Sequence, residues 1–228
     1  SSSAIKMVEI EGAGKGMYRI ERYAIEPLPK DSVMEGNINN LDAVSDAVKR
    51  CHKRLGSNIK NLALALPNAA VISKKILVPA GQSEEDLELQ VETEANQYIP
   101  FALDEVNLDF QVLGPAPNSV EDVEVLIAAS RKDKIIDRVA VAEAAGLKAA
   151  VMDVDVFASQ TAFELIESQF TDRGKDQNIA IIDVGASIMA VNVLRNDQSI
   201  YMREQPFTGN QLTQEIQNRF RVSSQEAQ

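Results

Sequence analysis

Two stretches that lie far apart in the chain follow one pattern, and this internal repeat restricts the possible folds more than any other feature. Residues 3–10 (SAIKMVEI) and 187–194 (SIMAVNVL) each begin with a small residue and continue as an alternating apolar run. In both places a polar or glycine-rich turn and a second alternating run follow. Period-two runs joined by such a turn indicate a β-hairpin. We therefore predict a duplicated α/β unit, with extra residues inserted in the first copy.

The second copy shows what the first should also contain. There, an apolar run ends at Asp183, just before a turn of small residues at 185–187. An equivalent strand is therefore expected upstream of Ser1, and further strands and helices of the second copy are expected beyond Gln228. The chain also opens on serine rather than methionine, so we expect a piece of a longer protein.

Apolar residues spaced three and four apart predict helices at about 40–55, 83–99, 130–145, 155–168 and 209–220. Apolar runs predict further strands at about 61–67, 71–79, 105–113, 122–130 and 147–153. Ser130 is expected to cap the third helix, with Ile135 and Ile136 pointing inward. Cys51 lies on the apolar stripe of the first helix and is expected in the core.

The composition excludes several kinds of function. A net charge of −11 and a pI near 4.7 argue against direct binding to nucleic acid or to an anionic membrane surface. A single cysteine excludes an internal disulfide and indicates a reducing compartment, and one cysteine with one histidine argues against a structural zinc site. No apolar stretch reaches the roughly 20 residues of a membrane-spanning helix. A bound nucleotide remains compatible, because its phosphates need only a local set of backbone N–H groups.

The turn that follows Asp183 has residues suited to an anion. Gly185, Ala186 and Ser187 keep the backbone accessible, so that its N–H groups can approach a phosphate closely, and the serine hydroxyl adds a donor. The carboxylate of Asp183 can hold Mg²⁺ through water. One such turn alone is more often an ordinary hairpin entry. Two of them facing each other would bind a nucleotide triphosphate from both sides.

These segments resemble the actin-like ATPase fold shared by actin, sugar kinases, heat-shock chaperones and the cell-division protein FtsA. SSSAIK is similar to the first phosphate loop of that fold, and IIDVGAS is similar to the second. A β-α-β-β-α block is inserted in the first half, as in FtsA. The resemblance implies a first core subdomain, an inserted subdomain, a return strand and an incomplete second core subdomain, at residues 1–72, 73–146, 147–153 and 154–228.

Within this fold, the chain resembles the PilM family of type IV pilus assembly most closely. The resemblance is carried by SSSAIKMVEI, EANQYIPF and the segment from DVGASIMAV to TGNQLTQEI. It implies a cytoplasmic scaffold that binds ATP or ADP with Mg²⁺. It also implies that the scaffold holds the N-terminal cytoplasmic tail of the inner-membrane protein PilN, in a groove between the core and the insertion. Other inner-membrane pilus assembly proteins are expected partners, self-association is a further option, and contact with the membrane is expected only through partners.

The resemblance assigns nucleotide-binding positions to this sequence, namely Ser1, Ser2, Ser3, Lys6, Asp183, Gly185, Ala186, Ser187 and Gly209. Asp183 is the expected metal position, through a water molecule on Mg²⁺. Lys6 matches a lysine that some relatives place against the phosphates, but an outward-facing strand lysine fits its pattern equally well. Gly209 matches a glycine-containing turn of the relatives, although it could also be a plain helix cap.

Whether the protein hydrolyses ATP depends on residues that depart from the pattern of hydrolysing relatives. Asp155 lies at the start of the connecting helix, where those relatives keep an acid or glutamine that positions water. An acid there is also favourable for the helix dipole alone. Ala186 and Ser187 stand where many relatives have a further acid or glycines, so we expect hydrolysis to be weak or absent. The alternative functions are an ATPase or small-molecule kinase, and a filament-forming protein like FtsA.

Overall fold

The computed structural model describes residues 2–14, 16–206 and 208–227. The chain divides into two compact units, one formed by Ser1–Ala65 with Val139–Gln228 and the other by Leu66–Arg138. The second unit overlaps the predicted insertion, although it begins and ends earlier in the sequence. The exact subdomain boundaries at 73 and 146 stay a prediction. No helix in the described part of the chain is both long and apolar enough to cross a membrane.

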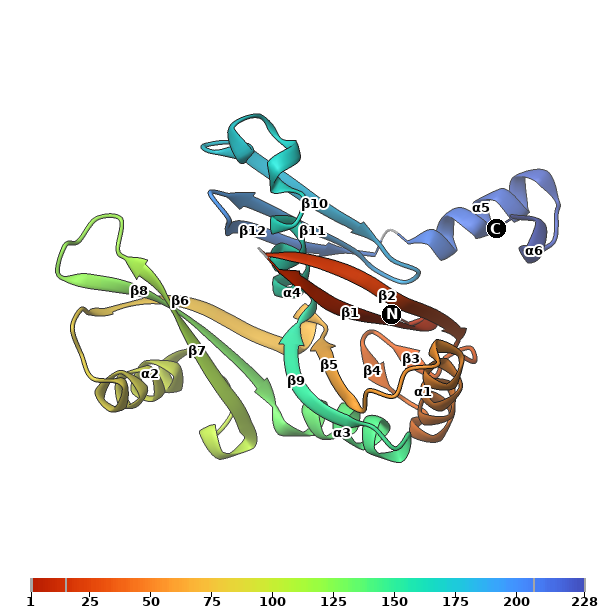
Figure 1. Cartoon of the computed structure of the whole chain (residues 1–228), viewed down its shortest axis with the longest axis horizontal. Coiled ribbons are helices and arrows are strands. Elements are labelled where there is room, and N and C mark those ends of the chain that lie inside the picture. Colours follow the sequence, from red (N-terminus) through yellow and green to blue (C-terminus); the bar gives the residue numbers. More distant parts are fainter. Residues whose placement is uncertain (1, 15, 207, 228) are drawn as a thin grey trace. The chain divides into compact units, whose positions relative to one another are not determined.

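The first predicted hairpin is formed by β1 (Ala4–Gly14) and β2 (Met17–Pro27), which pair in antiparallel fashion (Figure 1). One face of the hairpin packs on α1 (Leu41–Leu55), where Ile5 and Met7 meet the apolar stripe of the helix. Cys51 is fully buried there, as predicted, and its thiol donates to Ala24 O at 3.5 Å. Amphipathic spacing therefore fixes which face of α1 meets the hairpin.

A buried acid joins the hairpin to the same helix. The side chain of Glu26, at the end of β2, is only 10% exposed. Its carboxylate accepts a hydrogen bond from Arg50 Nε at 2.7 Å, and it forms an ion pair with Arg54 Nη2 at 3.0 Å. The hydrogen bond from Arg50, with the nearby charges of both arginines, holds the pKa of Glu26 below its ordinary value.

The rest of this half of the first unit differs in small ways from the predictions. A short hairpin of β3 (Val33–Met34) and β4 (Asn37–Ile38) forms between β2 and α1, where no strand is predicted. Two further strands, β5 (Asn61–Leu66) and β9 (Lys148–Val154), form a sheet of their own. Helix α3 (Lys132–Ala144) joins the core through Val141 and Ala142.

Two expectations for α3 are wrong. Ser130 does not cap the helix, because it is the penultimate residue of β8 and its hydroxyl donates to Ala70 O at 2.8 Å. The side chain of Ile136 does not point inward, since it is 61% exposed. The helix begins later than predicted, at Lys132, and its buried residues lie in its second half.

The second unit is a sheet of three antiparallel strands covered by one helix. The strands are β6 (Val71–Pro79), β7 (Val106–Pro115) and β8 (Asp122–Arg131), in the order β6-β8-β7. Helix α2 (Glu84–Tyr98) is capped by Ser83 and places Val91 and Ala95 against the sheet. Val78, Val91 and Val125 are fully buried at the centre of this core. Strand β6 therefore lies at an edge of its sheet.

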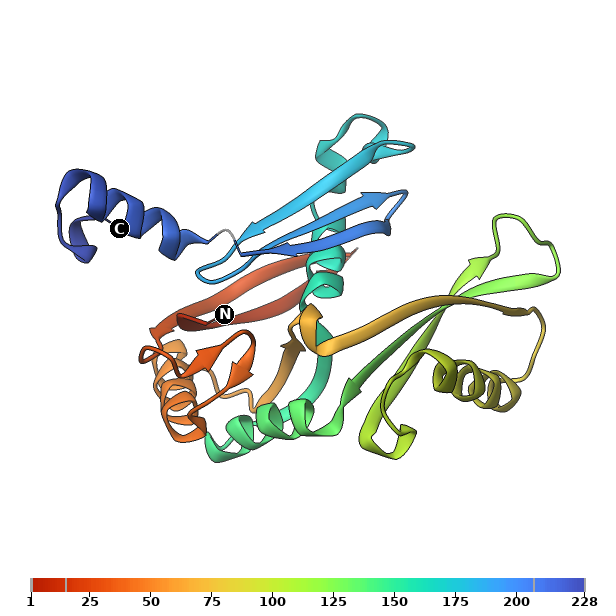
Figure 2. The same cartoon turned by 180° about the vertical axis from the view of Figure 1, so that it is seen from behind.

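The predicted second copy is formed by β10 (Asn178–Val184), β11 (Met189–Arg195) and β12 (Gln198–Gln205), which pair in that order (Figure 2). The connecting helix α4 (Asp155–Glu164) is shorter than predicted. It is followed by a 3₁₀ turn at Glu167–Gln169 and by a tight turn at Thr171–Gly174, in which Asp172 and Arg173 have positive φ. Phe163 and Phe170 place their ring centroids 5.4 Å apart. Helices α5 (Gly209–Phe220) and α6 (Ser224–Ala227) complete the described chain.

Candidate functional site

The turn between β10 and β11 requires a glycine at its first position. The backbone N–H of Gly185 donates to Ile188 O at 3.0 Å, which closes the turn. A Cβ atom on residue 185 would lie 2.6 Å from that same oxygen, closer than real side chains come to a backbone atom. Any other residue would therefore force the turn to open. Glycine at this position keeps the backbone of the predicted second phosphate loop compact and accessible.

The start of helix α5 holds this turn from one side. The N–H of Gly209 donates to Gly185 O at 3.0 Å, and the N–H of Asn210 donates to Ala186 O at 3.3 Å. Gly209 is thus brought to the second turn, as its assignment to the site requires. It does not precede the helix as a cap, however, because it is the first helical residue.

The residue that caps α5 is Thr208, which sequence reasoning missed. Its hydroxyl accepts from Gln211 N at 3.0 Å, while Gln211 Oε1 accepts from Thr208 N at 3.1 Å. Thr208 is buried, with 6% of its surface exposed. The signal was present in the sequence, because threonine followed three positions later by glutamine is the pattern of a reciprocal capping box.

The two predicted phosphate turns meet directly. The hydroxyl of Ser2, just before β1, contacts the hydroxyl of Ser187, just before β11. Ser3 contributes its carbonyl, which accepts from Leu28 N at 2.9 Å and so ties the first turn to the end of β2. Ser1 lies outside the described residues. The structure therefore brings the small-residue turns of both copies to one place.

Two further predicted residues are close in sequence to these turns. Lys6 is exposed on β1 and pairs in register with Ile25, while its neighbours Ile5 and Met7 face α1. This orientation is that of an outward-facing strand lysine, and a contact with phosphate stays a prediction. Asp183 is exposed near the end of β10 and lies opposite Ala190 of β11.

The acid nearest in sequence to the second turn is Asp183, and its role toward Mg²⁺ stays a prediction. No group of three potential ligands gathers anywhere among the described residues. Mg²⁺ keeps several of its waters and takes one or two carboxylates together with substrate phosphates. A single strand-end carboxylate at Asp183 is compatible with that coordination.

Asp155 is the first residue of α4, after a Val154 cap that offers no side-chain acceptor. Its carbonyl accepts from Ser159 Oγ at 2.8 Å. An acid in the first turn is favourable at the positive end of the helix dipole. The position explains Asp155 without catalysis, and a catalytic role stays a prediction.

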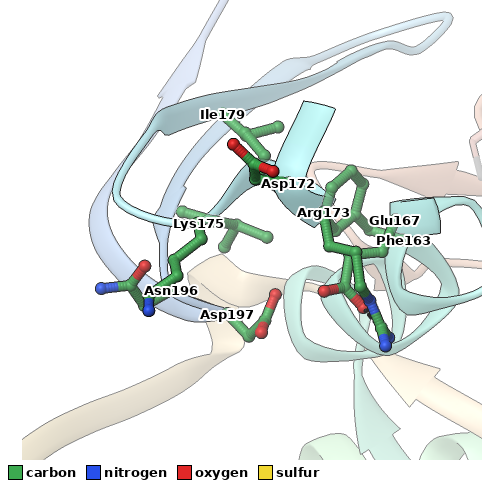
Figure 3. A pocket seen from close by; sticks show the side chains of 10 residues that line it. Phe163, Glu167, Asp172, Arg173, Lys175, Ile179, Asn196 and Asp197 are labelled. Atoms are coloured by element: carbon green, nitrogen blue, oxygen red, sulfur yellow. Dashed lines mark hydrogen bonds and ion pairs between the residues drawn. The ribbon is translucent and has the colours of Figure 1, made fainter. Parts of the chain in front are cut away.

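A separate hollow of about 400 Å³ opens beside the β11–β12 turn and contains none of the predicted site residues (Figure 3). Its walls are held by internal contacts. Arg173 pairs with Glu167 at 2.8 Å, which raises the pKa of the guanidinium, and the Asn196 amide exchanges hydrogen bonds with Asp176. Gly174 has a φ of +74° and lies against Ile179. This hollow is a surface depression between stabilising contacts.

Comparison with known proteins gives a match over the whole chain. The family model described as type IV pilus assembly protein PilM matches residues 1–228. A solved structure titled "PilM-PilN type IV pilus biogenesis complex" is similar with a TM-score of 0.80 and 29% sequence identity. That match covers 99% of this chain, but this chain spans only 65% of that one.

A more distant match shows the fold alone. The ethanolamine utilization protein EutJ from Carboxydothermus hydrogenoformans is 13% identical, with a TM-score of 0.51. The match covers 99% of this chain and 56% of that chain. Together with the stronger match, it confirms the predicted actin-like ATPase fold.

Proposed function

The chain belongs to the family of the type IV pilus assembly protein PilM, and we propose that it forms the nucleotide-binding, PilN-binding part of a scaffold in pilus assembly. The observation that carries the proposal is the similarity to the PilM chain of a PilM–PilN complex over 99% of this chain. The scaffold is expected in the cytoplasm, held at the inner membrane through its partners.

The nucleotide part of the proposal rests on the paired turns. The phosphates of ATP or ADP would lie against the backbone of Ala186 and Ser187, with the hydroxyl of Ser2 on the opposite turn. Asp183 would hold Mg²⁺ through water and so offset the negative charge of the phosphates. The metal supplies charge neutralisation, and the protein supplies oriented N–H and hydroxyl donors.

The partner part of the proposal rests on strand β6 at the edge of its sheet. Its neighbour β8 pairs with all nine residues from Val71 to Pro79 without a bulge, so the strand is continuous. The two lysines of β6, on opposite faces of the sheet, already have partners within the protein. Lys74 Nζ lies 4.0 Å from the ring centre of Tyr98, and Lys75 pairs with Glu124 at 3.3 Å. An extended tail with alternating apolar residues would add to such an edge through backbone hydrogen bonds.

A synthetic PilN tail tests this mode of binding on the full-length protein. Two peptides are compared with the unmodified tail, each N-methylated on alternate residues of opposite parity. In an added strand only every second N–H faces the sheet, so one peptide should lose binding and the other should keep it. The expected affinity of the unmodified tail is about micromolar. If both methylated peptides bind like the unmodified tail, strand addition is ruled out.

The competing function is ATP hydrolysis, in which Asp155 at the start of α4 would position the attacking water, as the resemblance implies. Steady-state phosphate release by the full-length protein separates the two functions. A scaffold should turn over far more slowly than about one ATP per second, which lies at the low end of ordinary enzymes. A faster rate that Asp155→Asn abolishes would make the protein an enzyme.

A further inference from the structure

We propose that the first turn of α5, fixed by Thr208, acts as a positioning element that orients two backbone N–H groups of the second phosphate turn toward the nucleotide. This inference rests on the proposed nucleotide function and adds residues to it that lie outside the phosphate loop. It starts from the four hydrogen bonds that join the turn to the helix and close the cap of the helix.

Because the peptide bond is planar, these contacts fix the direction in which the neighbouring N–H groups point. In a trans peptide unit, the C=O group and the following N–H group point in opposite directions. The carbonyl of Gly185 is held by Gly209 N and the carbonyl of Ala186 by Asn210 N. The N–H groups of Ala186 and Ser187 must therefore both point away from α5.

These two N–H groups have no acceptor among the residues that the structure describes, whereas the N–H of Gly185 is already taken by Ile188 O. The pair available to an anion is thus Ala186 and Ser187. Two neighbouring N–H groups that point the same way form a small concave donor for a phosphate oxygen. The hydroxyl of Ser187, which meets Ser2, lies beside this pair.

Thr208 keeps the donors of α5 in register with the turn. The residue is buried, and the reciprocal bonds with Gln211 define where the helix begins. A helix that started one residue later would withdraw the N–H of Gly209 from Gly185 O. Thr208 and Gln211 would then affect phosphate binding without touching the phosphate.

Substitutions at the first helical position separate positioning from helix formation. Proline is well tolerated there and suits the extended backbone of Thr208, which has φ −138° and ψ 152°. Gly209→Pro removes the N–H and places a ring carbon against Gly185 O, while Gly209→Ala keeps the N–H and makes only an ordinary 3.5 Å contact. We expect the proline variant to bind Mg-ATP and inorganic pyrophosphate about tenfold more weakly than the alanine variant, a loss of about 1.4 kcal/mol.

The second part of the test measures ligand binding to capping variants by calorimetry on the full-length protein. Thr208→Ala should weaken the binding of both ligands, and Thr208→Ser should restore it. Ser83→Ala, which removes the cap of α2 in the other compact unit, should lower stability to a similar degree and leave affinity unchanged. If the wild-type protein binds neither ligand, the proposed nucleotide-binding function is wrong. If wild type binds and both Gly209→Pro and Thr208→Ala bind equally well, only the positioning role is overturned.

Discussion

The hydroxyl groups of Ser2 and Ser187 contact each other although 185 positions separate them in the sequence. Each serine precedes the first strand of a hairpin, β1 in one case and β11 in the other. The contact therefore joins the turns that precede corresponding strands of the two copies. A ligand that binds one turn lies next to the other, so the ends of both copies can contribute donors to the same phosphate chain.

Asp183→Ala tests the metal position. The substitution removes the acid proposed to hold Mg²⁺, so the affinity of the full-length protein for Mg-ATP should fall by about tenfold or more, as expected for a bond to a charged group. Calorimetry with and without Mg²⁺ measures the effect. Asp172→Ala, an acid of the separate hollow, serves as the control. Equal Mg-ATP affinity in wild type and Asp183→Ala would exclude Asp183 from the site.

Gly185→Ala tests the geometry of the second turn. The new Cβ would come within 2.6 Å of Ile188 O, so the turn must shift, at a cost of about 1–3 kcal/mol. Thermal unfolding should show this loss, and nucleotide binding should weaken. Gly12→Ala is the matched control, because a Cβ at Gly12 meets nothing within 4 Å. Equal stability of the two variants would contradict the proposed constraint.

Leu194→Ala tests the packing of the second copy. Leu194 is 1% exposed and among the largest fully buried side chains, so its truncation should lower the free energy of unfolding by about 2–5 kcal/mol. Leu212→Ala, at a position 56% exposed on α5, should change it by about 0.5 kcal/mol or less. Urea denaturation of the two variants measures the difference. A small effect at Leu194 would show that the core tolerates the cavity.

Glu26 makes stability depend on pH with a defined sign. Its pKa is lowered in the folded protein, chiefly by the hydrogen bond from Arg50. A lowered pKa contributes stability above the unfolded-state pKa, and that contribution is lost as the pH falls through the folded-state pKa. Glu26→Gln should therefore be less stable than wild type at neutral pH, and the gap should narrow in acid. Urea denaturation from about pH 7 to about pH 3 checks this, with Glu88→Gln on exposed α2 as control. A gap of constant size would show that Glu26 is not responsible.

Much of the fold was readable from periodicity, because the apolar residues alternate in strands and recur every three to four residues in helices. The bounds of α1, α2 and α5 lie close to their predictions. The small hairpin of β3 and β4 was missed, since its turn is Glu35-Gly36 rather than the usual Asn-Gly. Both residues nevertheless adopt positive φ, of 49° and 76°.

The two turns of the candidate site could be predicted from the sequence, but the hydrogen bonds that join α5 to the second turn could not. Small residues after Asp183 and around Ser2 mark accessible backbone, and the repeat relates the two turns. The hydrogen bonds from α5 to the turn depend on where a helix begins, to within one residue. Apolar spacing gives only the approximate start of this helix, and the Thr208–Gln211 pair is the pattern that defines it to the residue.

The buried cysteine of α1 has a practical consequence for spectroscopy. Cys51 is fully buried, and burial raises the pKa of its thiol, so that little reactive thiolate reaches solvent while the core is closed. Because the chain has no other cysteine, a fluorophore attached through an engineered surface thiol will label one chosen position without removal of a native one. The rate at which a thiol reagent labels Cys51 itself should report how often the packing between α1 and the first hairpin opens.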